Sequence, residues 1–163
     1  MPSLDVVSTV DLQSLDNAVN NSKREIASRY DFRSSKTEIN LDRKEKKIHI
    51  ISGDDWKVNT VKDILISQCI KQKVDPKSLD FSKIDTVSTT VARMDIQIKE
   101  GISKEAGQKI VKYIKSLKIK VQPAILDEKV RITGKQIDDL QEIMRLLGEQ
   151  DYGVPLQFVN MKS

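Results

Sequence analysis

The chain has 163 residues, of which 38% are hydrophobic and 32% are charged, a composition that indicates a globular protein rather than a disordered one. Its single cysteine, Cys69, excludes a disulfide framework and a multi-cysteine zinc site, and the net charge of +4 permits a polyanionic partner without requiring one. No apolar stretch approaches the ~20 residues of a membrane span, and the first residues carry no signal-peptide pattern. We therefore expect a cytoplasmic protein with no membrane partner.

The first half of the chain alternates strand and helix signals. Residues 4–10 are typical of a strand, and Asp11 can cap a helix whose apolar positions recur at three- and four-residue steps to about Tyr30. Residues 36–41 and 48–52 alternate polar and apolar side chains around a polar turn, which predicts a hairpin. A second helix follows, with its buried stripe at Val58, Val61, Leu65 and Cys69.

A polar stretch separates the two halves. Residues 75–88 contain Pro76 and lack a clear period, which predicts a linker. The second half then repeats the order of the first. Its elements are a strand over 90–99, a helix capped by Ser103, a hairpin of strands 120–126 and 129–133, a final helix and a last strand over 156–160. The final helix is expected to bury Ile137, Leu140, Met144 and Leu147.

Each half therefore predicts a βαββαβ unit. Such a unit folds as a four-stranded antiparallel sheet with both helices on one face, so the expected fold class is α+β with two tandem ferredoxin-like, or RRM-like, domains. The other face of each sheet has no helices, and its side chains can meet solvent or a partner. Divided in simple chain order, the domains would be residues 1–87 and 88–163.

No enzymatic motif stands out. The single histidine, His49, lies on the solvent side of its strand, and the sequence points to no partner that would make it a general base. The pair Gly134-Lys135 resembles the end of a phosphate-binding P-loop, but Gln136 stands where Ser or Thr should bind magnesium. We therefore expect no enzymatic activity, no cofactor and no metal.

Basic residues concentrate in the second half, where seven lysines lie between residues 99 and 120. Helical and strand periodicity place many of them on one helix face and on the helix-free sheet faces. Long basic and amide side chains on a sheet can hold phosphates and reach base edges. The expected binding residues are Arg93, Lys99, Lys109, Lys112, Lys115, Lys118, Lys120, Gln122, Arg131 and Lys135. The alternative is a solvated lysine-rich helix beside an ordinary polar sheet face.

Aromatic side chains are scarce in this pattern. The predicted hairpin strands lack the Phe and Tyr residues on which RRM domains stack bases, so binding should be driven by charge and should weaken with salt. Trp56, at the start of the second helix, is expected to be a hydrophobic staple or core anchor rather than a stacking residue.

Collinear segments that cover essentially the whole chain carry a family resemblance. They are Met1-Pro2-Ser3-Leu4-Asp5-Val6-Val7-Ser8, Asp16-Asn17-Ala18, Arg29-Tyr30-Asp31-Phe32, Gly101-Ile102, Lys109-Ile110-Val111-Lys112, Lys118-Ile119-Lys120-Val121-Gln122, Val130-Arg131-Ile132-Thr133-Gly134-Lys135, Asp138-Asp139-Leu140-Gln141 and Pro155-Leu156-Gln157-Phe158. Together these segments resemble the YajQ family of bacterial proteins.

The resemblance implies two ferredoxin-like domains that exchange their N-terminal strands. Residues 11–102 would form the first domain, and residues 1–10 with 103–163 the second. It also implies a cytosolic protein that binds nucleotide or RNA and catalyses no reaction. With the basic pattern, it predicts RNA or a small nucleotide on the basic surface of the second domain and in the cleft between the domains. The alternative is a regulatory adaptor that responds to a nucleotide and docks a protein partner.

Overall fold

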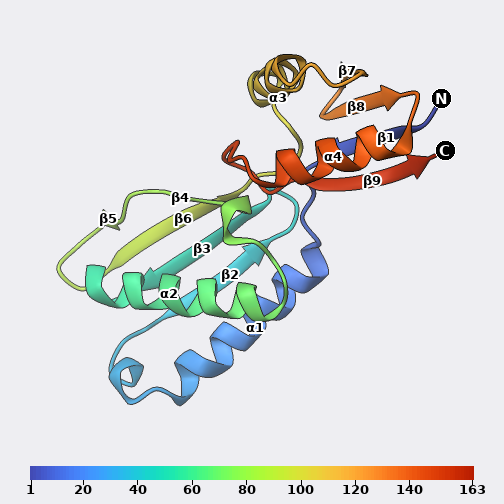
Figure 1. Cartoon of the computed structure of the whole chain (residues 1–163). Coiled ribbons are helices and arrows are strands. Elements are labelled where there is room, and N and C mark those ends of the chain that lie inside the picture. Colours follow the sequence, from blue (N-terminus) through green and yellow to red (C-terminus); the bar gives the residue numbers. More distant parts are fainter. The chain divides into compact units, whose positions relative to one another are not determined.

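A computed structural model describes residues 1–163, which form two compact units. The first unit is Val10–Lys99, and the second unit combines Met1–Thr9 with Glu100–Ser163. Each unit has an antiparallel sheet, two α-helices and its own hydrophobic core (Figure 1). The α+β class with tandem ferredoxin-like folds, predicted from periodicity, is therefore confirmed.

The two α-helices and the strands β2, β3 and β6 of the first unit lie close to their predicted positions. Asp11 caps the first helix by accepting hydrogen bonds from the backbone N–H groups of Gln13 and Ser14, and Asp54 caps the second by accepting one from Lys57. The elements are α1 (Leu12–Ser28), the 3₁₀ helix η1 (Tyr30–Phe32), β2 (Glu38–Asp42), β3 (Lys47–Ser52), α2 (Asp55–Lys71), η2 (Pro76–Ser78), β4 (Leu79–Phe81), β5 (Asp85–Thr86) and β6 (Ala92–Ile98).

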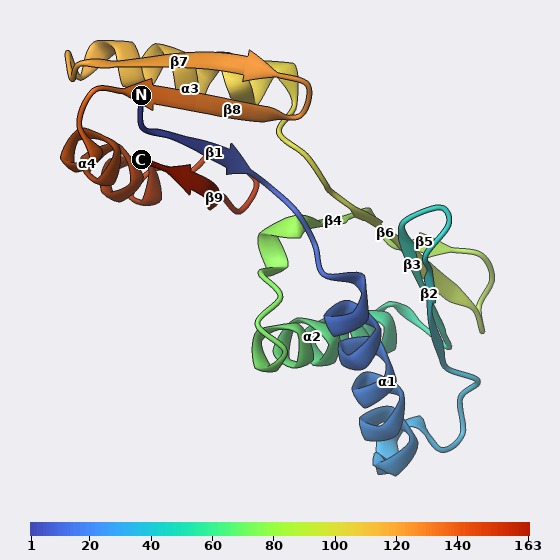
Figure 2. The ribbon, with the colours of Figure 1, turned by 90° about the vertical axis from the view of Figure 1, so that its right-hand side faces the viewer.

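The sheet of the first unit has the strand order β2-β3-β6-β4, and β5 adds a short pairing to β6. Helices α1 and α2 pack on one face, where they bury alternate residues of β3 and β6 such as Ile48, Ile50 and Ile96 (Figure 2). The β2–β3 turn is held by the Asp42 carboxylate, which accepts hydrogen bonds from the N–H groups of Lys44 and Glu45.

Residues 75–88 are not a linker. They contain η2 and the strands β4 and β5, and β4 pairs with β6 in the register Leu79↔Ile98 to Phe81↔Ile96. Leu79 belongs to the core of the first unit with 4% of its surface exposed. The strand was missed because three residues are too few to show a period of two, and the polar composition around them is typical of a loop.

The second unit assembles segments from both ends of the chain. Its elements are β1 (Ser3–Val7), α3 (Lys104–Ser116), β7 (Val121–Leu126), β8 (Lys129–Gly134), α4 (Ile137–Gly148) and β9 (Gln157–Lys162). The strand order is β7-β8-β1-β9, so β1 lies between β8 and β9 (Figure 2). Leu4 and Val6 of β1 are buried with Ile110 and Ile114 of α3, and Ser103 caps α3.

Two burial predictions are wrong. Trp56 is 62% exposed and is neither a staple nor a core anchor, because it occupies the solvent side of the first turn of α2. Ile137 is 37% exposed, while Ile143 is fully buried with Leu140 and Leu147 in α4. Leu140, Ile143 and Leu147 recur at steps of three and four residues and face the core. Ile137 is the first residue of the helix and lies at the end of this buried face. None of the helices has the length and apolar character needed to cross a bilayer.

Candidate functional site

The predicted binding residues are divided between the two units. Arg93 lies on β6 and Lys99 follows it, so both belong to the first unit, whereas the other eight belong to the second. On the exposed face of β6, the Arg93 guanidinium donates to the Asp85 carboxylate at 3.2 Å. The prediction of a ligand in a cleft between the domains stays a prediction.

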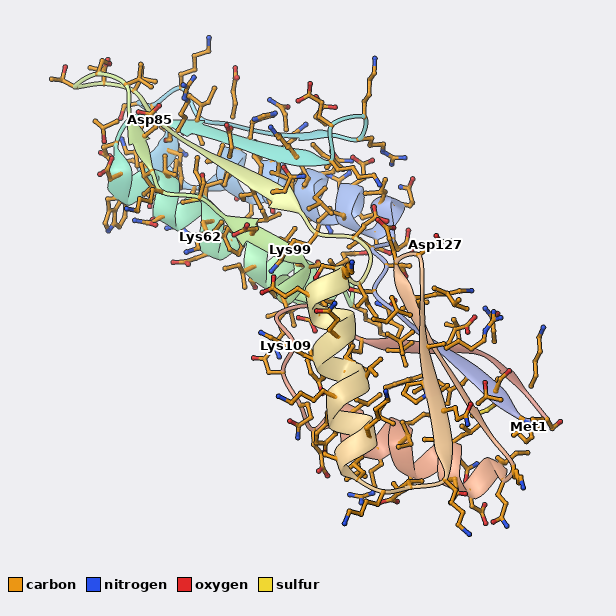
Figure 3. All side chains as sticks on the ribbon, turned by 90° about the horizontal axis from the view of Figure 1, so that it is seen from above. Met1, Lys62, Asp85, Lys99, Lys109 and Asp127 are labelled. Carbon is orange, nitrogen blue, oxygen red and sulfur yellow. The ribbon has the colours of Figure 1, made fainter.

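Strand register brings several of the remaining lysines to one end of the second sheet. Val121 pairs with Gly134, so Lys120 and Lys135 are the next residues beyond this last pair of β7 and β8. Ser3 pairs with Thr133 and with Lys162, which adds the end of β9 to the same edge. Figure 3 shows Met1 at this end of the sheet and Asp127, in the β7–β8 turn, at the opposite end.

The C-terminal half of α3 continues this positive surface. The helix ends at Ser116 and a four-residue loop returns the chain to β7, so Lys112 and Lys115 lie toward the end that holds Lys120. Lys118 is in this loop in a left-handed conformation with φ of 56°. Lys109 lies a turn further back along the helix (Figure 3). We call the group the basic end: Lys112, Lys115, Lys118, Lys120, Lys135 and Lys162.

The lysines of the basic end form no ion pairs, and all are exposed. Helix α4 begins at the same end, and its N-cap residue Gln136 makes no side-chain capping hydrogen bond. The first backbone N–H groups of a helix carry partial positive charge and lack partners within the helix. Asp138 and Asp139 in the first turn offset part of this charge. The basic end therefore combines unpaired ammonium groups with partly unsatisfied amide donors.

Arg131 has a different environment from these lysines. It lies on the helix-free face of the second sheet, where its Nε donates to Asp5 Oδ1 at 2.9 Å. Lys129 Nζ and Asn160 Nδ2 each donate to Asp5 Oδ2 at 3.1 Å. The Asp5 side chain is only 2% exposed, although this sheet face carries no helix, because these three side chains cover it. Arg131 is therefore part of an ion pair within the second unit, although its side chain is partly exposed.

The contacts of Asp5 shift the pKa values of Asp5 and Arg131 in opposite directions. Hydrogen bonds from Arg131, and then from Asn160 and Lys129, hold the pKa of the Asp5 carboxyl far below its usual value and outweigh the effect of burial, while the same contact raises the pKa of Arg131. Sequence patterns do not indicate Asp5 as the partner of Arg131. The only available signal was its place between Leu4 and Val6, where alternation assigns it to the helix-free face.

Catalytic groups are not assembled around the histidine. His49 Nδ1 lies 2.7 Å from Asp95 Oδ1 in the first unit, a pair that follows from the register His49↔Asp95. Both side chains are substantially exposed, at 39% and 56%. The nearby Ser82 hydroxyl accepts from the Asp95 backbone N–H rather than from the imidazole. Burial raises the pKa of the Cys69 thiol to about 12, so this group is no nucleophile at neutral pH.

Comparison with known proteins identifies relatives over the full length. A nucleotide-binding protein of Dehalococcoides mccartyi is 58% identical over 162 residues, covering 99% of both chains. A nucleotide-binding protein of Nitratidesulfovibrio vulgaris is 56% identical over 163 residues, and one of Cytophaga hutchinsonii is 49% identical over 162 residues. The family described as "Nucleotide-binding protein YajQ-like" matches residues 2–162. The chain therefore belongs to the YajQ-like family.

Proposed function

We propose that this chain is a non-catalytic nucleotide-binding protein that holds the phosphates of RNA or nucleotides at the basic end of its second unit. The family description and the printed names of the relatives support nucleotide binding. One observation supports the basic end as the binding site. Lysines from α3, from the loop after it and from the ends of two strands lie close together there and have no ion-pair partners. A protein partner, the alternative expected from the sequence, stays a prediction.

Lysines without internal partners suit this role better than Arg131. A lysine binds phosphate as a point charge and releases condensed counterions, which gives affinity without sequence specificity. Arg131 would have to leave a buried carboxylate to do the same. The absence of aromatic side chains from β7 and β8 supports binding to the phosphate backbone rather than to stacked bases.

Removing charge from the basic end should weaken RNA binding and flatten its salt dependence. We expect the triple variant Lys118→Gln, Lys120→Gln, Lys135→Gln to bind a single-stranded RNA 16-mer at least about tenfold more weakly at 0.1 M NaCl. The slope of log K against log salt should fall by about 2, since each lost phosphate contact removes about 0.7 on a single strand. Fluorescence anisotropy over a salt series measures both quantities.

The matched control removes the same charge from the first unit. Lys44→Gln, Lys71→Gln and Lys83→Gln change three exposed lysines outside the basic end. This control should leave the salt slope near that of the wild type, and both variants should keep the wild-type urea midpoint. Equal losses in the two triple variants would indicate nonspecific charge attraction and would contradict a site at the basic end.

The absence of catalysis has its own test. We expect wild-type protein to release no phosphate from ATP or GTP above a buffer blank, and His49→Ala to leave RNA affinity unchanged, because the His49–Asp95 pair is an exposed hydrogen bond with no activated nucleophile beside it. A malachite-green phosphate assay measures turnover. Turnover that disappears in His49→Ala would show that the proposal of a non-catalytic protein is wrong.

A further inference from the structure

The first unit contains a pocket that has no part in the binding proposed for the basic end. It has a volume of about 450 Å³ and lies between the second half of α1, η1 and the strand β2. Apolar residues of three elements line it. Ala27 of α1 is exposed, whereas Ile26 of α1, Phe32 of η1 and Ile39 of β2 are buried in the core behind it. A pocket of this volume with an apolar wall is in the range that binds small organic ligands.

The lining of the pocket includes the free edge of the sheet of the first unit. β2 is the outer strand of the order β2-β3-β6-β4, so alternate backbone N–H and C=O groups point away from β3 and have no partner in the sheet. Glu38, Ile39 and Asn40 of this strand line the pocket. Adjacent donors and acceptors along a strand edge match the pattern of donors and acceptors on the edge of a nucleobase.

A flat cation lines the same pocket. The Arg29 guanidinium donates two hydrogen bonds to the Asp31 carboxylate, at 3.0 and 2.8 Å, and lies 5.6 Å from the centre of the Phe32 ring. This pairing raises the pKa of Arg29 and lowers the pKa of Asp31. Because the bidentate pair restrains the guanidinium, little side-chain freedom remains to be lost when a planar base stacks on it.

Two further cations complete the lining. Lys23 on α1 and Arg33 after η1 form no ion pair, and Arg33 lies 5.3 Å from the centre of the exposed Tyr30 ring. With Arg29 paired to Asp31, the lining keeps these two cations against the single carboxylate of Glu38. The lining therefore combines apolar residues with two exposed cations that form no ion pair, which suits an anion attached to a flat, partly apolar body.

We propose that this pocket is a second ligand site, specific for a nucleoside monophosphate. The base lies against Ala27 and the Arg29 guanidinium and bonds to the edge of β2, and Arg33 and Lys23 hold the phosphate. The site is separate from the basic end, where lysines hold the phosphates of RNA or nucleotides without contacting a base. Neither site requires the other, so the failure of one leaves the other standing.

Calorimetric titration of the full chain with GMP and with AMP tests the proposal. We expect at least one of the two to bind with 1:1 stoichiometry, and ribose 5-phosphate to bind at least about tenfold more weakly because it lacks the base. Arg33→Gln with Lys23→Gln should weaken binding at least about thirtyfold, since two charge-assisted hydrogen bonds to phosphate are lost. Ala27→Trp, which places a large side chain in the pocket, should abolish binding.

Control variants separate this site from the basic end. Lys44→Gln with Lys71→Gln removes the same charge outside the pocket and should keep wild-type affinity for the monophosphate, as should the triple variant of the basic end. In ¹⁵N NMR spectra the ligand should shift the amides of Glu38, Ile39 and Asn40. Failure of both monophosphates to bind, equal affinity for ribose 5-phosphate, or loss of binding in the basic-end variant instead of the pocket variants would each overturn the proposal.

Discussion

A chain that lacks residues 1–9 should lose the fold of the second unit and keep the fold of the first. β1 pairs with β8 over Ser3–Val6 and with β9 on its other side, so its removal breaks two strand ladders at once. Leu4 and Val6 are 1% and 0% exposed, and Val130 and Ile132 of β8 would lose their covering neighbours. The first unit draws all of its strands from Val10–Lys99 and should stay folded.

The size of the loss makes this the largest expected effect. Burying side chains such as Leu4 and Val6 contributes about 1.5–3 kcal/mol each. Together with the two ladders and the Asp5 ion pairs, this approaches the whole stability of a small domain, about 5–15 kcal/mol. The remaining residues 100–163 would have to form a sheet with a gap between β8 and β9.

Two-dimensional ¹⁵N NMR spectra measure the outcome directly, because amides of the second unit should collapse into the range of unfolded peptides while those of the first stay dispersed. A rescue variant serves as the control. Ser3 pairs with Lys162, so the start of β1 lies beside the end of β9, and residues 1–9 can be moved behind Ser163 through a short glycine-rich turn. This permuted chain should refold the second unit. A dispersed second unit in the simple deletion would contradict the central role of β1.

Replacing Asp5 with asparagine should destabilise the second unit by about 2–3 kcal/mol at pH 7. The carboxylate accepts hydrogen bonds from Arg131, Lys129 and Asn160 on its two oxygens. An amide has one acceptor oxygen, and its NH₂ group would face donors. Arg131 and Lys129 are partly exposed and regain some hydration, which limits the loss.

The effect of Asp5→Asn should depend on pH in a defined direction. Because the pKa of Asp5 is lowered in the folded state, its ion pairs stabilise the protein above the unfolded pKa near 3.9 and stop doing so as pH falls toward the folded value. The difference in unfolding free energy between wild type and variant should therefore be constant from pH 7 to about pH 5 and shrink below it.

Urea unfolding at pH 7, 5 and 3 measures this difference. Asp85→Asn is the matched control, because Asp85 also pairs with an arginine but both side chains are more than half exposed. It should change stability by less than about 0.5 kcal/mol at every pH. A pH-independent loss in Asp5→Asn would show that packing, rather than the ion pairs, makes Asp5 important.

Most elements of the fold were predictable because each has a local signal. Helices α1 and α3 begin directly after the predicted caps Asp11 and Ser103, because these side chains satisfy free N–H groups of a first turn. The hairpins follow from alternation on either side of polar turns. β4 escaped prediction because three residues contain too little pattern.

The candidate site was predictable only in composition. Helical spacing indicated a lysine-rich α3. Spacing alone could not show that Lys120 lies near Lys135, which follows from the pairing of Val121 with Gly134 in the sheet. Nor could it show that Arg131 is held by Asp5, more than a hundred residues away in the chain. The pocket beside β2 was missed because it depends on that strand being at a sheet edge.

The sequence by itself determined the number, type and order of the main elements, the excess of positive charge in the second half and the lack of catalytic motifs. Each of these depends on residues that are neighbours along the chain. The tertiary structure alone decided strand order, and with it the place of β1 between β8 and β9. The physical reason is that a strand's own period sets which side chains face the core, whereas its partners are set by backbone hydrogen bonds and packing between segments far apart in the sequence.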